Sequence, residues 1–581
     1  MNGLQPDFVL LNPEHGIIVI EVKDWKDDTL DIRSLGKAIR TAAHRKTEIT
    51  DLYCPSLGRT HRRSVASILV FPFLTAEGLR LVRREIPGMN YNSAEFITAE
   101  TEPQNLVHKI LDSLHPRVDS KITEAADDLR HWLIEPRFRK DQRQPLKLDD
   151  YARSLIIGKG SKSKRRRIKG TAGSGKSQII AARASEMARR GKRVLVLSYN
   201  VTLLNCLKDI AVRWPDPSLP SRDIRDNVVW LNFHQWAKRI CKTSNAALTY
   251  SGFWKDGHDT DLVLNQLIPD LTKEVLEGGH PESGAYDAVL IDEGQDFMAH
   301  WLHTATLAIR PDNDDHPDES KLGRPKPPSK PGGAGKRTTG SGELMIALDL
   351  TQDIYNRGSK WSEDLLEGIG FKGRWNFLDV SYRMPREVTA LAARFADDYL
   401  GESKVHRPEP PSTSVLALEQ KPPVLSWIQL NPDTDPSHLP ETLVEVMWDQ
   451  LPSVEDLAVA ELVFLTSNHQ LGLGVVSVLQ NKGVKVQHTF DKNSKPSLAQ
   501  RMGFWKGGAR VKGTTIHSFK GWGSRSLVIH IDSGFDEHAR KLAYCALTRL
   551  QSDTDCALTV ICECPKLGSY GQTWPAFELR N

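Results

Sequence analysis

The segment Gly170-Thr-Ala-Gly-Ser-Gly-Lys176-Ser177 fits the pattern G-x-x-x-x-G-K-[ST] and sets the architecture expected for this chain. The pattern predicts a strand, a phosphate-binding turn and a helix. Its glycines let successive backbone N–H groups converge on phosphate oxygens, and the helix presents its positive end. Lys176 would add charge on the outer phosphates, and Ser177 would offer a hydroxyl to Mg²⁺. The expected nucleotide-binding residues are Gly170, Gly173, Ser174, Gly175, Lys176 and Ser177.

A second element supports this prediction. Residues 287–293 read Asp-Ala-Val-Leu-Ile-Asp-Glu, an apolar strand that ends in two carboxylates. Ligands of parallel sheets gather at such strand ends. Asp292 would hold the metal through its water shell, and Glu293 would orient or deprotonate an attacking water.

From residue 149 onward, apolar strands alternate with helical stretches, which predicts a parallel α/β sheet. Residues 311–342 interrupt the pattern with six prolines and six glycines, an acidic first half and a basic second half. We expect this insertion to be disordered, because it has too little apolar surface to offset the entropy of ordering. The basic run 159–169 is expected to form an exposed loop. The alternative is that this run binds nucleic acid.

Composition excludes several classes of protein. The chain has 581 residues with 77 basic and 73 acidic side chains, a net charge of +4 that by itself neither requires nor excludes a polyanion partner. No apolar run is long enough to span a bilayer, and residues 1–10 lack the pattern of a signal peptide. Seven cysteines without paired spacing do not make a disulfide framework. We therefore expect a cytoplasmic protein with reduced thiols and no membrane contact.

The start of the chain carries a separate pattern. Pro6-Asp7 followed by Glu21-Val-Lys23 fits the nuclease pattern PD-x(n)-E-x-K. A hairpin with its turn at residues 12–16 would pair residue 11 with 17, 10 with 18 and 7 with 21. Asp7 and Glu21 would then be cross-strand neighbours with Cβ atoms about 5 Å apart. Two such carboxylates suit Mg²⁺ or Mn²⁺. Lys23, on the same face, would stabilise the negative charge that develops on a phosphate.

The surroundings of this hairpin allow two interpretations. A helix is expected over 34–53 and a strand over 65–73. Residues 34–64 hold seven basic and two acidic side chains, which suits a phosphate backbone but is equally compatible with a solvated face. The carboxylates themselves are either a metal site or the solvated strand end of an inactive remnant.

Together with further motifs in the same order, the glycine-rich segment and Asp292-Glu-Gly-Gln-Asp296 resemble the UvrD/Rep group of superfamily 1 helicases. The resemblance implies two RecA-like lobes with ATP between them, Gln352 as sensor of the γ-phosphate, and Arg383 and Arg549 as arginine fingers. It also implies contacts to DNA by Asn200, Phe233, His234, Tyr355, Thr515 and His517. The motifs that carry it are 194–207, Asn232-Phe-His234, Asp349-Leu-Thr-Gln352-Asp-Ile-Tyr355, Ser381-Tyr-Arg383, Thr515-Ile-His517-Ser-Phe-Lys520-Gly521 and Ala546-Leu-Thr-Arg549.

Residues 6–25 resemble the nuclease-related domain called NERD, which is often fused to helicases of this type, and a weaker match continues through 51–55 and 69–75. The expected organisation is a NERD-like domain over 1–110, a helical connector over 111–148, a first RecA-like lobe over 149–380 and a second over 381–581.

Three departures from the helicase pattern matter. Segment 148–152 lacks the glutamine that reads adenine, Gly523 replaces a glutamate, and Arg357 replaces an aromatic residue that stacks on a base in relatives. Arginine can also stack, though less hydrophobically. The spaces 242–285 and 467–510, where accessory subdomains are usually inserted, are short, so the motor either unwinds duplexes or only translocates along one strand.

The expected function is an ATP- and Mg²⁺-dependent DNA translocase or helicase, fused to a metal-dependent nuclease-like domain that uses Mg²⁺ or Mn²⁺. The resemblance implies 3′ to 5′ movement and a place in DNA processing, repair or defence against foreign DNA. Single-stranded or partly duplex DNA is the expected partner, with a partner protein or a homo-oligomer possible. Two alternatives stay open: an ATP-switched nucleic-acid sensor with an inactive nuclease, and an RNA-directed helicase.

Overall fold

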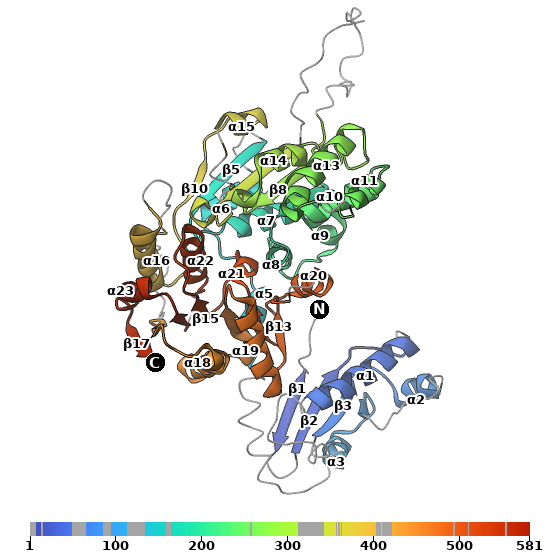
Figure 1. Cartoon of the computed structure of the whole chain (residues 1–581). Coiled ribbons are helices and arrows are strands. Elements are labelled where there is room, and N and C mark those ends of the chain that lie inside the picture. Colours follow the sequence, from blue (N-terminus) through green and yellow to red (C-terminus); the bar gives the residue numbers. More distant parts are fainter. Residues whose placement is uncertain are drawn as a thin grey trace, which may run out of the picture.

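The computed structural model describes residues 7–12, 16–28, 30–48, 65–84, 94–112, 134–158, 164–255, 258–311, 342–355, 357, 361, 363–401, 408–409, 421–491, 494–508, 510–551 and 555–580. Some predicted features lie outside these ranges: Pro6, segment 51–55, the middle of the connector, and residues 312–341 of the insertion. Within them, the chain is an α/β protein with three sheets whose strands are mostly parallel (Figure 1).

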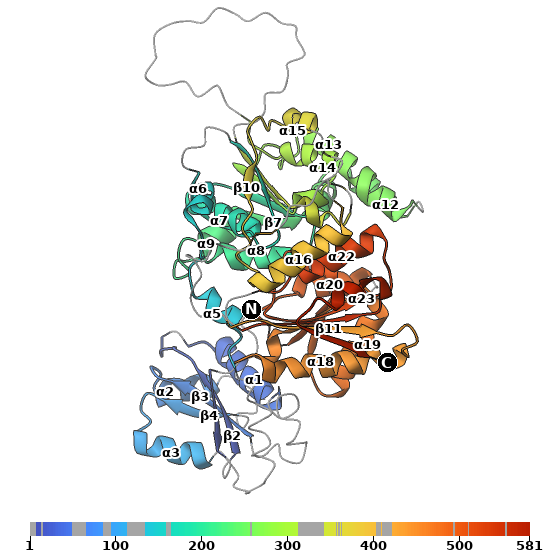
Figure 2. The ribbon, with the colours of Figure 1, turned by 90° about the vertical axis from the view of Figure 1, so that its left-hand side faces the viewer.

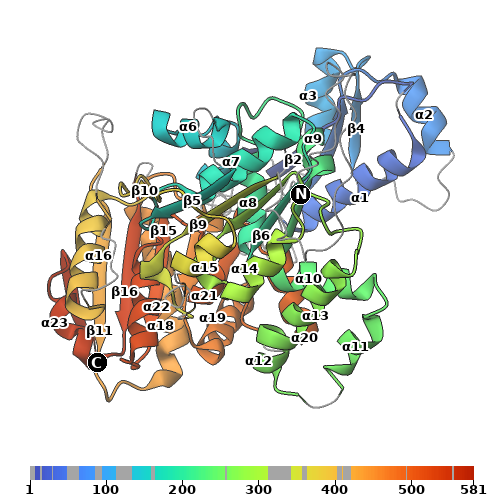
Figure 3. The same ribbon diagram turned by 90° about the horizontal axis from the view of Figure 1, so that it is seen from above.

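The first sheet has the order β1-β2-β3-β4. Strands β1 (Phe8–Asn12) and β2 (Gly16–Val22) pair antiparallel, and Leu11 faces Ile17 as predicted. Strands β3 (Val65–Phe71) and β4 (Glu95–Thr98) continue the sheet in parallel. Figures 1 and 3 show this sheet to one side of the two larger sheets.

Helices cover both faces of the first sheet. Helix α1 (Ile32–Glu48) and helix α2 (Ala76–Arg84) pack on one face, and α3 (Pro103–Asp112) packs on the other. Leu35, Ile39 and Ala42 of α1 are buried, which confirms the helix predicted around them.

The second sheet is six-stranded and fully parallel, in the order β10-β5-β9-β8-β6-β7. Helices α6 to α9 cover one face, and α10, α13, α14 and α15 cover the other. The strands are β5 (Arg165–Gly170), β6 (Val194–Ser198), β7 (Val228–Asn232), β8 (Ala288–Asp292), β9 (Glu343–Leu348) and β10 (Asn376–Leu378). The helices are α6 (Asp150–Ile157), α7 (Lys176–Arg189), α8 (Leu203–Ala211), α9 (Arg222–Asn227), α10 (Phe233–Lys242), α11 (Ala247–Gly252), α12 (Thr260–Leu262), α13 (Ile268–Glu277), α14 (Ala299–Thr306) and α15 (Glu363–Gly368).

The third sheet is seven-stranded and also parallel, in the order β13-β14-β12-β15-β16-β11-β17. Its strands are β11 (Val424–Leu430), β12 (Leu462–Leu465), β13 (Val486–His488), β14 (Val511–Thr514), β15 (Ser526–Ile531), β16 (Ala557–Cys562) and β17 (Ala576–Arg580). Its helices are α16 (Arg386–Tyr399), α18 (Leu439–Ser453), α19 (His469–Asn481), α20 (Ser494–Gly503), α21 (Ile516–Phe519), α22 (Glu537–Leu547) and α23 (Gly568–Gly571).

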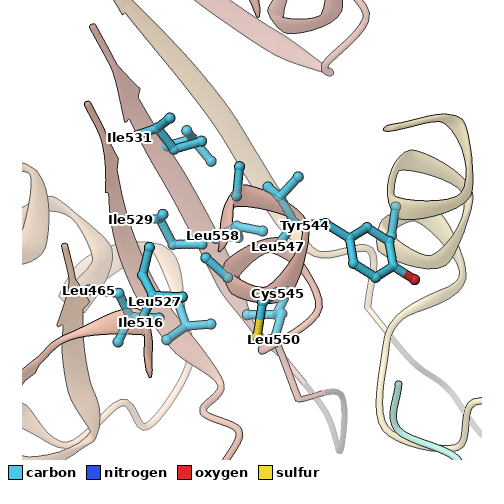
Figure 4. Close-up of a cluster of buried hydrophobic side chains, with 14 of the residues drawn as sticks. Leu465, Ile516, Leu527, Ile529, Ile531, Tyr544, Cys545, Leu547, Leu550 and Leu558 are labelled. Atoms are coloured by element: carbon cyan, nitrogen blue, oxygen red, sulfur yellow. The ribbon is translucent and has the colours of Figure 1, made fainter. Parts of the chain in front are cut away.

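The two larger sheets meet through one layer of helices. Helices α18 and α19 cover the outer face of the seven-stranded sheet, while α16 and α22 lie on the face toward the six-stranded sheet (Figure 2). Figure 4 shows Cys545 and Leu547 of α22 against Leu527 and Ile529 of β15. The alternating pattern of strands and helices from residue 149 therefore predicted parallel α/β structure correctly.

Helix α5 (Arg137–Gln142) bridges the two larger units. On the seven-stranded side, the Arg137 backbone N–H donates to Glu461 Oε1 at 3.1 Å, and Phe138 meets Trp505 edge to face with centroids 6.1 Å apart. On the six-stranded side, Arg213 beyond α8 donates to the carbonyl of Gln144 at 2.9 Å. The segment that precedes α6 is thus clamped against both units (Figure 2).

The prediction of an exposed loop over 159–169 is wrong for the part that the structure describes. Residues 165–169 belong to β5, and Arg165, Arg166 and Arg167 are buried. One carboxylate of a neighbouring strand supplies the counter-charge, because Glu343 of β9 forms ion pairs with both Arg166 and Arg183 of α7. Arg165 and Arg167 instead donate to the backbone carbonyls of Gly342 and Gly373, and a basic strand can occupy a core when its cations have such acceptors.

No helix among the described residues has the length and apolar character needed to cross a lipid bilayer.

Candidate functional site

The glycine-rich loop joins β5 to α7 in a geometry that only glycine accommodates easily. Gly173 and Gly175 adopt positive φ angles of 79° and 89°. A Cβ on Gly173 would lie 2.5 Å from Ser381 Oγ and 2.9 Å from Arg383 Cβ. The loop therefore packs directly against the segment that carries Arg383, and α7 begins directly after the loop.

Lys176, the first residue of α7, folds back over this loop. Its ammonium donates to the carbonyls of Gly170 at 2.9 Å and Thr171 at 2.7 Å, and it lies 3.5 Å from Asp349 Oδ2. The side chain is buried, with a relative exposure of 7%. The cation is thus held above the loop by acceptors that phosphate oxygens could replace.

Asp292 ends β8 beside Ser177 of α7. The Ser177 hydroxyl hydrogen-bonds its carboxylate, and Asp292 Oδ2 has no hydrogen-bond partner among the described residues. Burial raises the pKa of Asp292 to about 7, and the charge of Glu293 adds to the effect, while Ser177 and Lys176 oppose it. A hydroxyl with a spare buried carboxylate oxygen is a donor set that fits Mg²⁺.

Glu293 lies immediately after the strand in a left-handed conformation, with φ 51° and ψ 46°. Such a conformation is uncommon for a side chain of this size and is a form of local strain found at functional sites. The Gln295 amide donates to the carboxylate, and Lys520 Nζ lies 3.5 Å from Oε2. Burial alone would raise the pKa of Glu293, but Lys520, Lys176 and Arg549 outweigh it and lower the pKa, so an ionised acceptor faces the loop.

Arg549, which follows α22, reaches the six-stranded unit. Its guanidinium donates to Gln352 Oε1 at 2.7 Å, while its Nε donates to the carbonyl of Cys545 at 2.8 Å. The Gln352 amide in turn donates to Asp349 Oδ2 at 3.0 Å, and the same oxygen lies 3.5 Å from Lys176 Nζ. Arg549 and Lys176 are therefore joined across the boundary between the two units through two intervening side chains.

Arg383 lies on the other side of the glycine-rich loop. Its guanidinium donates to the carbonyl of Thr548 at 2.7 Å and of Trp522 at 3.4 Å. Its Nε has no hydrogen-bond partner among the described residues. Burial and repulsion from Arg549 lower the pKa of Arg383 to about 9. The two arginines thus form a pair of cations that an anion in the cleft would stabilise.

Three residues that join the parts of this site had no role assigned from the sequence, and two of them form a pair. Lys520 donates to Asp296 Oδ1 at 2.7 Å and Oδ2 at 2.9 Å, and this buried ion pair joins the seven-stranded unit to the turn after β8. Both residues lie inside motifs that were recognised, yet spacing alone gave no sign that they meet. Asp349 is a third such residue, because it orients Gln352.

The residues predicted to contact DNA divide into three groups. Asn200 donates its amide to the carbonyls of His517, Ser518 and Lys520 at 3.1, 3.2 and 3.3 Å. Thr515 caps α21 by accepting from the Ser518 N–H at 3.2 Å. Asn200 therefore holds the turn 515–520 against the six-stranded unit, while Thr515 stabilises the turn from within, so both polar side chains serve contacts within the protein.

Tyr355 and His517 form an aromatic surface that is partly exposed, with ring centroids 5.9 Å apart. Tyr199 extends it, because its ring lies 5.0 Å from that of Tyr355. These side chains come from both larger units and offer faces on which a base could stack.

Phe233 and His234, at the start of α10, face inward. Phe233 has a relative exposure of 0% and stacks on Trp301 at 4.8 Å, so in this arrangement it belongs to the core and presents no surface to DNA. The ring of His234 lies 3.0 Å from the carbonyl of Leu264, and burial lowers the pKa of His234 to about 4. The first turn of the amphipathic helix α10 packs on the sheet. For this reason Phe233 and His234 are not exposed, although they occupy a motif that implies contact with DNA.

The N-terminal pattern also comes together in part. Glu21 is buried, and its Oε2 accepts from Lys23 Nζ at 3.0 Å, as expected for side chains two residues apart on one strand face. Asp7 is exposed, and its Oδ2 accepts from the Val22 N–H at 2.7 Å. No group of three or more His, Cys, Asp or Glu side chains suited to a metal occurs among the described residues.

Comparison of the chain with protein-family models found no match, and comparison with curated proteins found none either. The function is therefore argued from the site itself.

Proposed function

We propose that the chain is an ATP-driven translocase or helicase of the UvrD/Rep type that acts on single-stranded DNA, with the six- and seven-stranded units as two RecA-like lobes. The observation that carries this proposal is the 2.7 Å contact between Arg549 and Gln352. It supports a cleft in which one unit supplies the glycine-rich loop and the carboxylates, and the other supplies a permanent cation.

The side chains of the cleft suit a triphosphate. Lys176, Arg383 and Arg549 would surround the phosphate charge, which is the main contribution of a protein to phosphoryl transfer. Ser177 and Asp292 would hold Mg²⁺, which neutralises negative charge on the phosphates when bound. Glu293, whose lowered pKa keeps it ionised, would accept a hydrogen bond from the attacking water and orient it.

Movement would follow from the division of the site between two units. Hydrolysis and release remove the charge that draws Arg383 and Arg549 toward the loop, so the units separate and close again with the next nucleotide. The contact of Asn200 with the turn 515–520 lies on the same boundary and would change in each cycle. A DNA strand bound by Tyr355, His517 and their neighbours would be held first by one unit and then by the other. The resemblance implies that the protein would move along it from 3′ to 5′.

The test is an ATP hydrolysis assay run in parallel with single-stranded DNA, duplex DNA and RNA. We expect single-stranded DNA to stimulate turnover most, and Lys176→Ala and Glu293→Gln to abolish it. Lys421→Ala is a matched control, because this exposed lysine pairs with Glu455 and Asp555 and contacts no residue of the cleft. Turnover that persists in both cleft variants overturns the proposal, and stronger stimulation by RNA favours the RNA-directed alternative.

A second function is proposed for the first sheet, namely metal-dependent cleavage of DNA. It is supported by the buried Glu21 carboxylate beside Lys23, with Asp7 at the adjoining strand end. Mg²⁺ or Mn²⁺ would be held by the two carboxylates. We expect cleavage that Glu21→Ala and Lys23→Ala both abolish. Wild-type protein that leaves single-stranded and duplex DNA uncut with either metal would instead make this sheet an inactive remnant.

The cellular setting follows from these two activities. A motor and a nuclease in one chain suit DNA processing, repair or defence against foreign DNA in the cytoplasm. Loss of the nuclease alone would leave an ATP-switched module that binds nucleic acid.

A further inference from the structure

Arg357 occupies an unusual position between the aromatic surface and the cleft. Its guanidinium carbon lies 4.8 Å from the ring centroid of Tyr199, 4.9 Å from that of Trp301 and 5.2 Å from that of Tyr355. Three aromatic faces around one cation form a set of cation–π contacts. The surface on which a base could stack is therefore built around this arginine.

Hydrogen bonds fix the same guanidinium. One terminal nitrogen donates to the backbone carbonyl of Asp296 at 2.9 Å, and the other donates to Asn265 Oδ1 at 3.0 Å. The Arg357 backbone N–H donates to Asp353 Oδ1 at 2.9 Å. A planar guanidinium with two directed donors holds its partners in one geometry, which a flexible lysine cannot do.

Asp296 connects this cation to the catalytic carboxylate. Arg357 holds the backbone of Asp296, while the Asp296 side chain pairs with Lys520 at 2.7 Å. Lys520 also lies 3.5 Å from Glu293 Oε2. A displacement of Arg357 therefore moves the turn 294–296 and, with it, the cation that keeps Glu293 in place.

We propose that Arg357 is a positioning residue that couples a base on the Tyr199–Tyr355 surface to the placement of Glu293. This inference rests on the proposed ATP-driven motor. A base that stacks on these rings alters their cation–π contacts with Arg357. The resulting change in the position of Arg357 reaches Glu293 through Asp296 and Lys520. The structure thus assigns to Arg357 the stimulation of ATP hydrolysis by DNA rather than hydrolysis itself.

The test compares the ratio of DNA-stimulated to basal ATP hydrolysis, at saturating oligo(dT), in wild type, Arg357→Ala and Arg357→Lys. We expect Arg357→Ala to reduce the ratio about tenfold, as loss of one hydrogen bond from a charged group would. Arg357→Lys keeps the cation–π contacts but not both hydrogen bonds, so it should restore part of the ratio. Arg540→Ala is the matched control, because this arginine also lies over an aromatic ring, Phe535, at 5.2 Å.

The outcomes separate coupling from binding and from folding. Fluorescence anisotropy with the same oligo(dT) measures affinity, and the unfolding temperature of each variant shows that it is folded. An unchanged ratio in Arg357→Ala overturns the inference. A reduced ratio that returns to the wild-type value when oligo(dT) is raised further also overturns it, because Arg357 would then only bind DNA. Absence of hydrolysis by the wild type would overturn the proposed motor itself, and this inference with it.

Discussion

Lys520 and Asp296, 224 residues apart in sequence, form a buried ion pair with Nζ–O distances of 2.7 and 2.9 Å, so a cation of the seven-stranded unit is fixed to the turn behind the strand that carries Asp292. The pair leaves Lys520 within 3.5 Å of Glu293 as well. One lysine therefore serves two carboxylates at the boundary between the units.

Replacement of this lysine should destabilise the protein strongly. Lys520→Ala leaves the buried Asp296 carboxylate without its paired cation, and breaking a buried pair in this way costs about 3–5 kcal/mol. Urea unfolding measures the change. Lys541→Ala is the control, since its i,i+4 pair with the exposed Glu537 should contribute at most about 0.5 kcal/mol. Similar decreases in the free energy of unfolding in the two variants would show that the buried pair contributes no more to stability than the exposed one.

The raised pKa of Asp292 predicts a pH dependence of stability. Its pKa rises from an ordinary 3.8 to about 7, so the folded state binds this proton more tightly than the unfolded chain does. The resulting stabilisation is present below the ordinary pKa and is lost as the pH rises through about 7. Glu293, with its lowered pKa, acts in the opposite sense and at lower pH.

Urea unfolding at several values between about pH 5 and about pH 8 tests this expectation. Asp292→Asn should flatten the decline in the free energy of unfolding over this range. Asp216→Asn is a control, because hydrogen bonds from Ser218 lower its pKa and place its contribution at more acidic pH. A profile that Asp292→Asn leaves unchanged contradicts the assignment.

Arg549 should act on the rate of ATP hydrolysis more than on ATP binding. Arg549→Lys removes the guanidinium contact to Gln352, and we expect kcat to fall roughly a hundredfold or more, as for other arginines that reach a transferring phosphate. Steady-state kinetics at saturating single-stranded DNA separate kcat from KM. Arg394→Ala, which removes an exposed pair with Asp398, should leave both constants near the wild-type values.

Two glycines with similar backbone angles separate crowding from conformational strain. Gly173 has φ 79° and no room for a Cβ, whereas Gly191 has φ 72° and nothing within 4 Å of the Cβ position. Gly191→Ala should cost about 1 kcal/mol of stability through the left-handed backbone alone. Gly173→Ala should in addition abolish binding of a fluorescent ATP analogue, because the loop and Arg383 must move apart. Equal nucleotide binding by both variants would refute this description of the loop.

The features predicted correctly from sequence depend on neighbouring residues. The pairing of Leu11 with Ile17 follows from the turn between them, and Leu35, Ile39 and Ala42 bury one face of α1 because of helical spacing alone. The strand–loop–helix around Lys176 is equally local, since its glycines specify the loop.

The features that sequence could not provide depend on partners far away in the chain. Arg166 was taken for a surface charge because Glu343, which balances it, lies 177 residues later on another strand. Phe233 has a motif position that implies DNA contact, yet its burial depends on Trp301, which packs on it from α14. The link from Arg357 to Glu293 depends on three segments that meet only in the folded protein.

The clamp formed by α5 determines where the molecule can be divided. Arg137 and Phe138 contact Glu461 and Trp505, while the carbonyl of Gln144 accepts a hydrogen bond from Arg213, so residues 137–144 pack with the two larger units. A shortened protein that begins at residue 145 would lose the aromatic contact to Trp505 and the hydrogen bond from Arg213. One that begins ahead of Glu135 keeps these contacts, which makes it the sensible starting point for preparing the two larger units without the first sheet.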